Sequence, residues 1–404
     1  MTLTCESTTH HHRKAVRLGS DTLEAVALLG CGHLASLRLA GVDVNPLWEP
    51  PWPSLEPEAY DRARHAAQYG PVEGRLLASL AGHSLCLNHF GDLTETETEA
   101  DGYFHGEASN LPWTAFEQKA DVEEARLSYG LDLPEAGLRF RRQLRLRPGE
   151  ATLYFKERIT NPTHFDSPLF CQQHVTLGPP FVERGVTRLD LPAQRGRTFA
   201  ESLGDVNPLA PDEDYSWPQA PLRDGGTQDL RIFPAQLRSL SIVTALLEPR
   251  GAISYVAVSN ARLGLLLVYV FPHSIYPWTA LWYENAGSEE IPWNAKTLAW
   301  GVEFGTTPFP VKRMDALTAG PLFDRPRFGT VPAGRTLEVS YQAHLFRIPS
   351  DWRGVDNVEH IDGETVVQET TTDRTVRARS AWQVSTDIRR PRASEGKGHE
   401  LLER

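Results

Sequence analysis

The chain has 404 residues and a net charge of −11, and 40% of its residues are hydrophobic. This length allows two ordinary domains or one large β-domain. Its many glycines and prolines (Gly 31, Pro 30) fit a globular, turn-rich protein with a sizeable core. The negative charge, with no stripe of basic residues, argues against nucleic acid or anionic membranes as main partners.

Neither the N-terminal residues nor the apolar runs of the sequence predict export or membrane insertion. The N-terminal M-T-L-T-C-E-S-T-T-H-H-H has no apolar stretch of the kind found in secretory signals. The longest apolar run, residues 263–271, is too short to span a bilayer. The four cysteines show no C-x-x-C spacing and are expected to be reduced, mostly buried thiols: Cys5, Cys31, Cys86 and Cys171. We therefore expect a cytoplasmic protein, either a monomer or a homodimer.

Strand patterns dominate the chain. Residues 56–68 form the best helix candidate, with a proline near the start and good helix formers after it. Apolar and polar residues then alternate with period two in 125–131, 151–160 and 337–345, which predicts half-buried strands. Residues 263–271 are apolar throughout, as in a strand covered on both faces. Closely spaced turn signals complete the pattern, which predicts a mainly β protein built as a large antiparallel β-sandwich.

The chain divides into three predicted parts. Residues 1–18 are expected to be a flexible N-terminus, and 19–385 a single domain without internal repeats or a clear linker. Residues 386–404 are charged and short of aromatics, which predicts a disordered tail. The run His10-His11-His12 suggests a metal site, but a flexible terminus is the preferred interpretation, so we predict no metal.

Three polar residues occur in unusual surroundings. Glu303 is a carboxylate within the apolar run W-G-V-E-F-G, which otherwise predicts a buried strand. His105 lies in H-G-E-A-S-N-L-P-W and His174 in C-Q-Q-H-V-T-L-G-P-P-F. A buried carboxylate needs either a partner or a use. Because imidazole titrates near neutral pH, the three together suggest an acid–base site.

The order of several motifs resembles the aldose 1-epimerase (galactose mutarotase-like) superfamily over roughly residues 20–350. The first half carries segments similar to that family's opening hairpin, its G-R-x-x-N-R-I segment and its H-G motif: G-C-G-H-L-A-S-L-R-L-A-G-V-D-V, G-R-L-L-A-S-L-A-G-H-S-L-C-L-N and D-G-Y-F-H-G-E-A-S-N-L-P-W. The second half carries segments similar to the family's histidine strand, glutamate strand and closing strand: P-L-F-C-Q-Q-H-V-T-L, G-V-E-F-G-T-T-P-F and V-P-A-G-R-T-L-E-V-S-Y.

This resemblance implies a β-supersandwich and the interconversion of α and β anomers of an aldose without a cofactor. Glu303 would be the general base that removes the proton of the C1 hydroxyl. His174 would be the general acid that protonates the ring oxygen, and His105 a hydrogen-bond donor beside it. The sequence departs from the family at Ser79, where an arginine is expected, and this removes one expected sugar contact.

Four further residues are predicted to bind the sugar. Arg75 could hold hydroxyl groups with its fork of donors, although a structural salt bridge is an equal alternative. Trp113 and Trp282 could stack on the apolar face of a sugar, with core packing as the alternative. Glu284 lies in the polar-aromatic segment upstream of Glu303 and is expected to line the same cleft.

Three other functions remain open from the sequence alone. A non-catalytic carbohydrate-binding domain on the same fold would explain the change at Ser79. A metal-dependent enzyme could use His105, His174 and Glu303 as a two-His-one-carboxylate site. A glycoside hydrolase would need a second carboxylate beside Glu303, for which Glu107 and Glu284 are the candidates.

Overall fold

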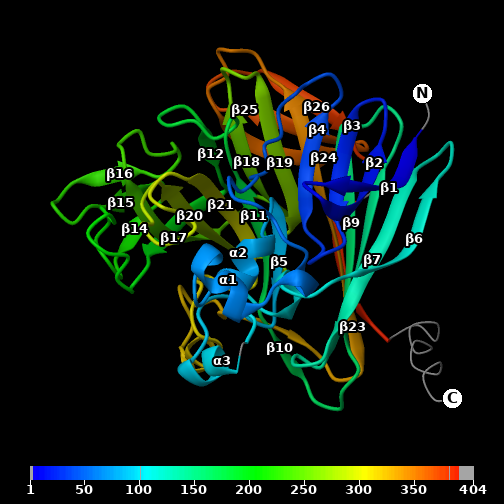
Figure 1. The fold of residues 1–404 in the computed structure, drawn as a ribbon. Coiled ribbons are helices and arrows are strands. Elements are labelled where there is room, and N and C mark those ends of the chain that lie inside the picture. The colour runs from blue at the N-terminus through cyan, green and yellow to red at the C-terminus, as the bar shows by residue number, and fades with distance from the viewer. Residues whose placement is uncertain (1–2, 101, 382, 391–404) are drawn as a thin grey trace, which may run out of the picture.

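The computed structural model describes residues 3–100, 102–381 and 383–390. They form two large antiparallel sheets that face each other across one apolar core, as the sequence predicts (Figure 1). The first sheet has 13 strands, in the order β1 (Thr4–His10), β2 (Arg13–Gly19), β3 (Leu23–Leu28), β4 (Leu34–Leu39), β5 (His83–Leu87), β11 (Cys171–Leu177), β21 (Leu298–Gly305), β20 (Trp278–Asn285), β17 (Ser239–Leu247), β13 (Ala193–Thr198), β14 (Asp214–Ser216), β15 (Gln219–Pro221) and β16 (Thr227–Asp229).

The second sheet has nine strands. Eight of them follow the order β12 (Arg188–Asp190), β18 (Ile253–Asn260), β19 (Leu265–Pro272), β23 (Arg335–Arg347), β9 (Thr152–Asn161), β8 (Leu138–Leu146), β7 (Ala125–Leu133) and β6 (Thr114–Ala120). The ninth, β27 (Ser385–Arg389), pairs with β23. The four segments predicted as strands from the sequence lie in β7, β9, β19 and β23, so these predictions are confirmed.

Smaller elements complete the molecule. A three-stranded sheet, β24 (Val355–Ile361), β25 (Glu364–Glu369) and β26 (Thr375–Arg379), packs its apolar side chains on the outer face of β19. β10 (Ser167–Leu169) pairs with β22 (Gly329–Val331). The helical segments are short: η1 (Pro57–Ala59), α1 (Arg62–Tyr69), α2 (Gly74–Ser79), α3 (Glu95–Glu99), η2 (Glu107–Ser109) and α4 (Arg313–Thr318). Among the described residues, no helix is both long enough and apolar enough to cross a membrane.

Three predictions are corrected at the level of local structure. Residues 4–18 are not a flexible terminus, because β1 and β2 pair along their whole length and form an edge of the first sheet. The helix predicted over 56–68 is split, since Tyr60 is extended and α1 begins only after its N-cap Asp61, whose side chain accepts from the Arg64 N–H. In the predicted tail, residues 386–389 belong to β27, and 391–404 lie outside the described residues.

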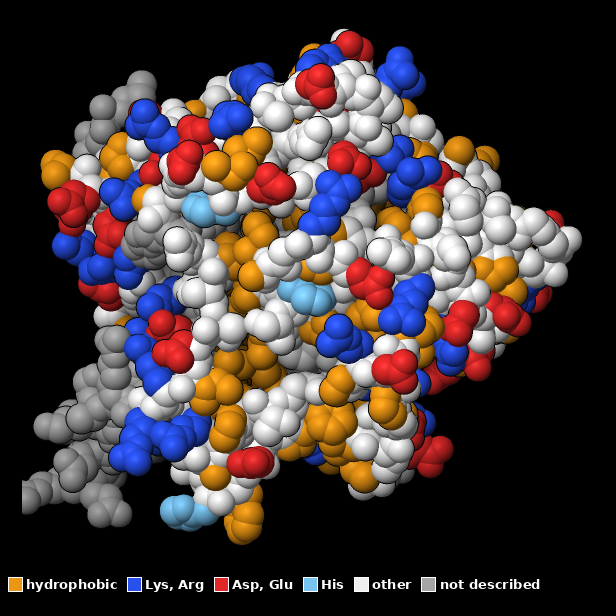
Figure 2. Space-filling model, turned by 180° about the vertical axis from the view of Figure 1, so that it is seen from behind, with side chains coloured by type: hydrophobic (Ala, Val, Ile, Leu, Met, Phe, Trp, Pro, Cys, Tyr) orange, Lys and Arg blue, Asp and Glu red, His pale blue; other side chains and the backbone are white. Residues whose placement is uncertain are grey.

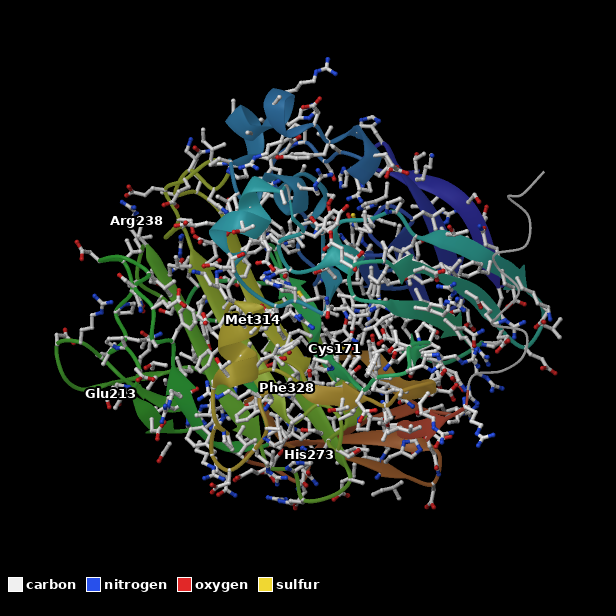
Figure 3. The ribbon with its side chains drawn as sticks, turned by 90° about the horizontal axis from the view of Figure 1, so that it is seen from below. Cys171, Glu213, Arg238, His273, Met314 and Phe328 are labelled. Atoms are coloured by element: carbon white, nitrogen blue, oxygen red, sulfur yellow. The ribbon has the colours of Figure 1, made fainter. Side chains whose placement is uncertain are left out.

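The cysteines are reduced and mostly buried, as predicted from the sequence. All four cysteines are free thiols, three of them buried, and Figure 3 shows Cys171 deep in the interior on β11. On the face shown in Figure 2, acidic and basic side chains are interspersed and form no patch of a single sign.

Alternation along the central strands of the first sheet separates its two faces. On β21, Trp300, Val302 and Phe304 point into the core between the sheets. Glu303 belongs to the opposite, outer face. That outer face is covered by the segment that carries α1 and α2, which lies beside β5 and β11 in Figure 1. The run W-G-V-E-F-G is therefore buried on both sides, and the covered outer face is where a cavity can form.

Candidate active site

A cavity of about 500 Å³ lies between the outer face of β11, β20 and β21 and the segment that carries α1 and α2. His105, His174 and Glu303 all line it, together with Trp282. The structure thus brings together three residues that are far apart in the sequence. The cavity volume lies within the range of small-molecule sites.

Sheet register places His174 directly across from Glu303. β11 pairs with β21 so that Gln173 lies opposite Phe304 and Thr176 opposite Gly301, and the same register sets His174 opposite Glu303. His174 Nε2 lies 3.3 Å from Glu303 Oε1. The other ring nitrogen, Nδ1, is 3.1 Å from the Thr176 hydroxyl, which fixes the orientation of the ring. Because both side chains stand on central strands, their geometry is set by the sheet.

Glycine makes room for the carboxylate. A Cβ at Gly301 would lie 2.5 Å from Glu303 Oε1 and 3.1 Å from the Cβ of Trp282. Any side chain at position 301 would therefore displace the carboxyl group of Glu303 or the ring beside it. The glycine in W-G-V-E-F-G is thus part of the site.

Glu303 is the least satisfied polar group of the cavity. Its side chain is almost fully buried, and its Oε2 has no hydrogen-bond partner among the described residues. Burial raises the pKa of this carboxyl well above its ordinary value. A carboxylate held in this way is a stronger base than one in water, and Oε2 is free to accept a proton from a ligand.

The two histidines are uncharged at neutral pH. Burial lowers the pKa of His174 to about 4. Burial and the neighbouring His174 and His89 also lower the pKa of His105 well below its usual range. His105 Nδ1 accepts a hydrogen bond from the Gly91 N–H at 3.1 Å, so the neutral ring carries its proton on Nε2. The neutral ring of His105 can therefore donate a hydrogen bond from Nε2.

His105 lies in a turn whose backbone has left-handed φ angles. Its φ is 62° and that of Gly106 is 84°, and a Cβ at Gly106 would lie 2.4 Å from the Leu87 carbonyl oxygen. The imidazole packs beside the rings of Phe104 and His174, at centroid distances of 4.3 Å and 5.3 Å. The H-G pair is thus needed for close backbone approach as well as for the imidazole itself.

Of the four further residues predicted to bind sugar, only Trp282 lines the cavity. Arg75 instead lies over the rings of Tyr60 and Tyr103. Trp113 is a core residue whose indole donates to the Ala108 carbonyl, so the core-packing alternative fits it. Glu284 accepts from the Gly287 and Ser288 N–H groups and holds that turn in place. Contrary to the prediction, these last three residues are not among those that line the cavity.

Sequence reasoning missed several residues of the cavity wall. Trp293 packs edge-to-face on Trp282 with ring centroids 5.4 Å apart, and both line the cavity. Tyr69 closes the wall from α1, and Glu73 lies at the start of α2. The only sequence signal was that Glu73 immediately precedes the segment G-R-L-L-A-S-L, which resembles the family's motif. Arg75 was predicted to bind the sugar, but Glu73 is the residue that lines the cavity.

Ser79, where the family has an arginine, is buried inside α2. Its hydroxyl lies within hydrogen-bond distance of the Leu76 carbonyl, and its own carbonyl accepts from the guanidinium of Arg13. Ser79 does not line the cavity. The hydrogen bonds of Ser79 are therefore those of a structural residue.

Metal-ligand geometry exists elsewhere in the molecule. Among the described residues, the ligand atoms of His10, His11 and Glu49 lie within 4.8 Å of one another, and these are the only ones to meet that spacing. His105, His174 and Glu303 do not, so the two-His-one-carboxylate hypothesis loses its geometric support. The glycosidase hypothesis loses its two proposed partners too, because Glu107 accepts from the Glu135 and Ala136 N–H groups and Glu284 is engaged in its turn.

Comparisons with known proteins bear on the fold. No protein-family model matches the sequence, and no curated protein sequence matches it. Solved structures do match. A candidate aldose 1-epimerase from Klebsiella pneumoniae superposes with a TM-score of 0.60 at 15% identity, over 84% of this chain and 82% of that one. A galactose mutarotase-like protein from Clostridium acetobutylicum gives a TM-score of 0.57 at 15% identity, over 86% of this chain and 99% of that one.

The chain has the galactose mutarotase-like fold. A third structure, of a galactose mutarotase related enzyme from Lactobacillus acidophilus, agrees with a TM-score of 0.52 at 12% identity, over 83% of this chain and 98% of that one. At such identities the likeness shows the mutarotase-like fold alone. What the site does has to be argued from its own residues.

Proposed function

We propose that this mutarotase-like chain is an aldose 1-epimerase-like enzyme that interconverts the α and β anomers of a sugar. The observation that carries the proposal is the free Oε2 of Glu303, buried in the cavity beside His174. Ring opening of a cyclic hemiacetal needs a base for the C1 hydroxyl and an acid for the ring oxygen. A carboxylate and an imidazole 3.3 Å apart can supply both groups.

The proton steps balance within this pair. Glu303 Oε2 takes the proton of the C1 hydroxyl, and a C1=O double bond forms. The C1–O5 bond breaks with its electrons going to O5, which receives a proton from His174, while the Nε2–H of His105 hydrogen-bonds to O5. After rotation about C1–C2, the same transfers in reverse close the other anomer and restore the pair.

The burial of the pair favours these transfers. In the forward step Glu303 gains a proton and His174 loses one, so the net charge of the pair does not change. Burial raises the pKa of Glu303 and lowers the pKa of His174, so at neutral pH the pair holds one proton and that proton rests on Glu303. The reactive form is the one in which the proton has moved to His174, because the carboxylate is then a strong base and the imidazolium a strong acid. No isolated charge is created in a cavity where it would be costly.

Two-dimensional exchange NMR on a panel of aldoses tests the proposal, because it measures anomer exchange at equilibrium. Wild type should accelerate exchange over buffer for at least one sugar. His174→Ala should lower the rate by about 10²- to 10⁴-fold, the usual contribution of a general acid. If sugars bind but wild type and buffer give equal rates, the chain is a carbohydrate-binding domain on this fold.

A further inference from the structure

The cavity wall is acidic. Besides Glu303, its lining includes Glu73, Asp92, Glu201 and Glu290. Among the described residues, no lysine or arginine lines it. Such a wall repels anions and attracts cations, and the low dielectric of a cavity strengthens both effects.

Three arginines of neighbouring segments make their contacts with other residues. Arg75 lies over the rings of Tyr60 and Tyr103. Arg238 pairs with Glu289, and Figure 3 shows it at the outer edge of the molecule. Arg184 donates to the side chain of Asn285 at 2.6 Å. None of these guanidinium groups lines the wall, so the usual bidentate partner of a phosphate is missing from it.

A second, independent observation points to a ligand at this wall. Glu303 is 2% exposed, and its Oε2 has no hydrogen-bond partner among the described residues although it belongs to the cavity lining. The same wall includes Trp282, which is only half-buried, and an indole ring can hold a sugar or an ammonium group by stacking or cation–π contact.

Glu73 is the half-buried carboxyl of this acidic wall. It precedes α2 and makes no side-chain capping hydrogen bond there. Burial, together with the charges of Asp92 and Glu290, raises the pKa of Glu73 to about 7. A cation in the cavity would relieve the repulsion among these carboxyls, and an anion would add to it.

We propose that the cavity selects amino sugars over neutral sugars and rejects sugar phosphates, with Glu73 as the specificity-determining residue. This inference deepens the proposed function and rests on it for the identity of the ligand as a sugar. The ammonium group of an amino sugar would be held by the carboxyl of Glu73 and the indole ring of Trp282. A phosphate would meet several carboxyls and no positive side chain, which disfavours its binding.

The test compares D-glucosamine, D-glucose and D-glucose 6-phosphate near neutral pH. Affinity is measured by NMR titration and anomer exchange by two-dimensional exchange NMR, on the full chain. We expect glucosamine to bind about fivefold to tenfold more tightly than glucose, the effect of roughly one favourable charge interaction, and glucose 6-phosphate more weakly than either. Glu73→Gln should bring glucosamine and glucose to within about twofold of each other.

Glu58→Gln is the matched control, because it removes the same charge from an exposed residue of η1. It should leave the order of affinities unchanged. If no sugar is epimerised but the order holds and depends on Glu73, the epimerase proposal fails and the selectivity stands. The selectivity is overturned if the phosphate binds as well as glucose, if Glu73→Gln leaves the order intact, or if none of the three sugars binds.

Discussion

Two carboxylates of this protein are equally buried and have opposite surroundings. Glu157, on β9 in the core between the sheets, accepts from Arg142 at 2.7 Å, Tyr341 at 2.8 Å and Gln173 at 2.8 Å. Glu303, on the outer face of the first sheet, has one histidine at 3.3 Å and an oxygen without a partner. Glu157 therefore has the environment of a structural group, and Glu303 that of a group kept free for a ligand.

The two environments meet on a single strand. Gln173 and His174 are neighbours on β11, and strand alternation sends them to opposite faces. Gln173 donates to Glu157 in the core, and His174 approaches Glu303 in the cavity. One strand thus links the rigid polar network of the core to the candidate active site, which holds the histidine in a defined position.

Breaking the core pair should give the largest change in stability. Glu157→Gln leaves the guanidinium of Arg142 buried without its counter-charge, and Arg142 has no exposed side-chain surface. Removing one partner of such a buried pair costs about 3–5 kcal/mol of unfolding free energy. Chemical denaturation followed by fluorescence measures it. A loss below about 1 kcal/mol would show that this network is not the structural one.

Gly301→Ala should affect the outer face without affecting the core. The new Cβ meets the flexible end of the Glu303 side chain, so the free energy of unfolding should fall by less than about 1 kcal/mol. The same contact should displace the carboxylate by about 1 Å, which should slow anomer exchange roughly 100-fold. Exchange NMR and thermal denaturation on the same sample measure both. Gly320→Ala is the matched control, because no atom lies within 4 Å of its Cβ, and it should change neither quantity.

Glu303→Gln should stabilise the protein, in contrast to Glu157→Gln. Burial raises the pKa of Glu303 in the folded state above its pKa in the unfolded chain, so the folded state binds this proton more tightly. The stability that this proton gives is fully present below the unfolded pKa, and it is lost as the pH rises through the folded pKa. An uncharged amide avoids this loss, which predicts a gain of about 1–3 kcal/mol at pH values above the folded pKa. Denaturation curves at acidic and alkaline pH measure it. A Glu303→Gln variant that is less stable than wild type at both acidic and alkaline pH would contradict the raised pKa of Glu303.

The rate of anomer exchange should have a bell-shaped dependence on pH. The pair works when it holds one proton, so activity falls near pH 4, where His174 becomes protonated while Glu303 is still protonated. It falls again above the raised pKa of Glu303, where no proton remains for the ring oxygen. Rates measured across this range by exchange NMR give both limbs. A profile without an alkaline limb would mean that Glu303 does not share a proton with His174.

The sandwich and the residues of the central site could be predicted from the sequence, and the cavity wall could not. Period-two alternation identified β7, β9 and β23 because each strand has one face in the core. Glu303 was recognised because a carboxylate in an apolar strand is unusual. Arg75 and Trp113 were assigned to the sugar by residue type, but the direction of a side chain in an irregular segment depends on packing that the sequence does not display.

The wall residues were missed for the same physical reason. Glu73 and Trp293 lie outside the strands, where no periodicity tells which side chains share a face. The N-terminal strands were missed because β1 is an edge strand with mostly exposed or half-buried side chains, so its composition is that of a polar terminus.

The most direct test of the contrast between Glu303 and Glu157 is anomer exchange by the Glu303→Gln variant on a sugar that wild type epimerises. The amide keeps the shape of the carboxyl group but cannot take the proton of the C1 hydroxyl. We predict a loss of about 10²- to 10⁴-fold in exchange rate with sugar binding retained. An exchange rate equal to that of wild type would show that Glu303 is not the base.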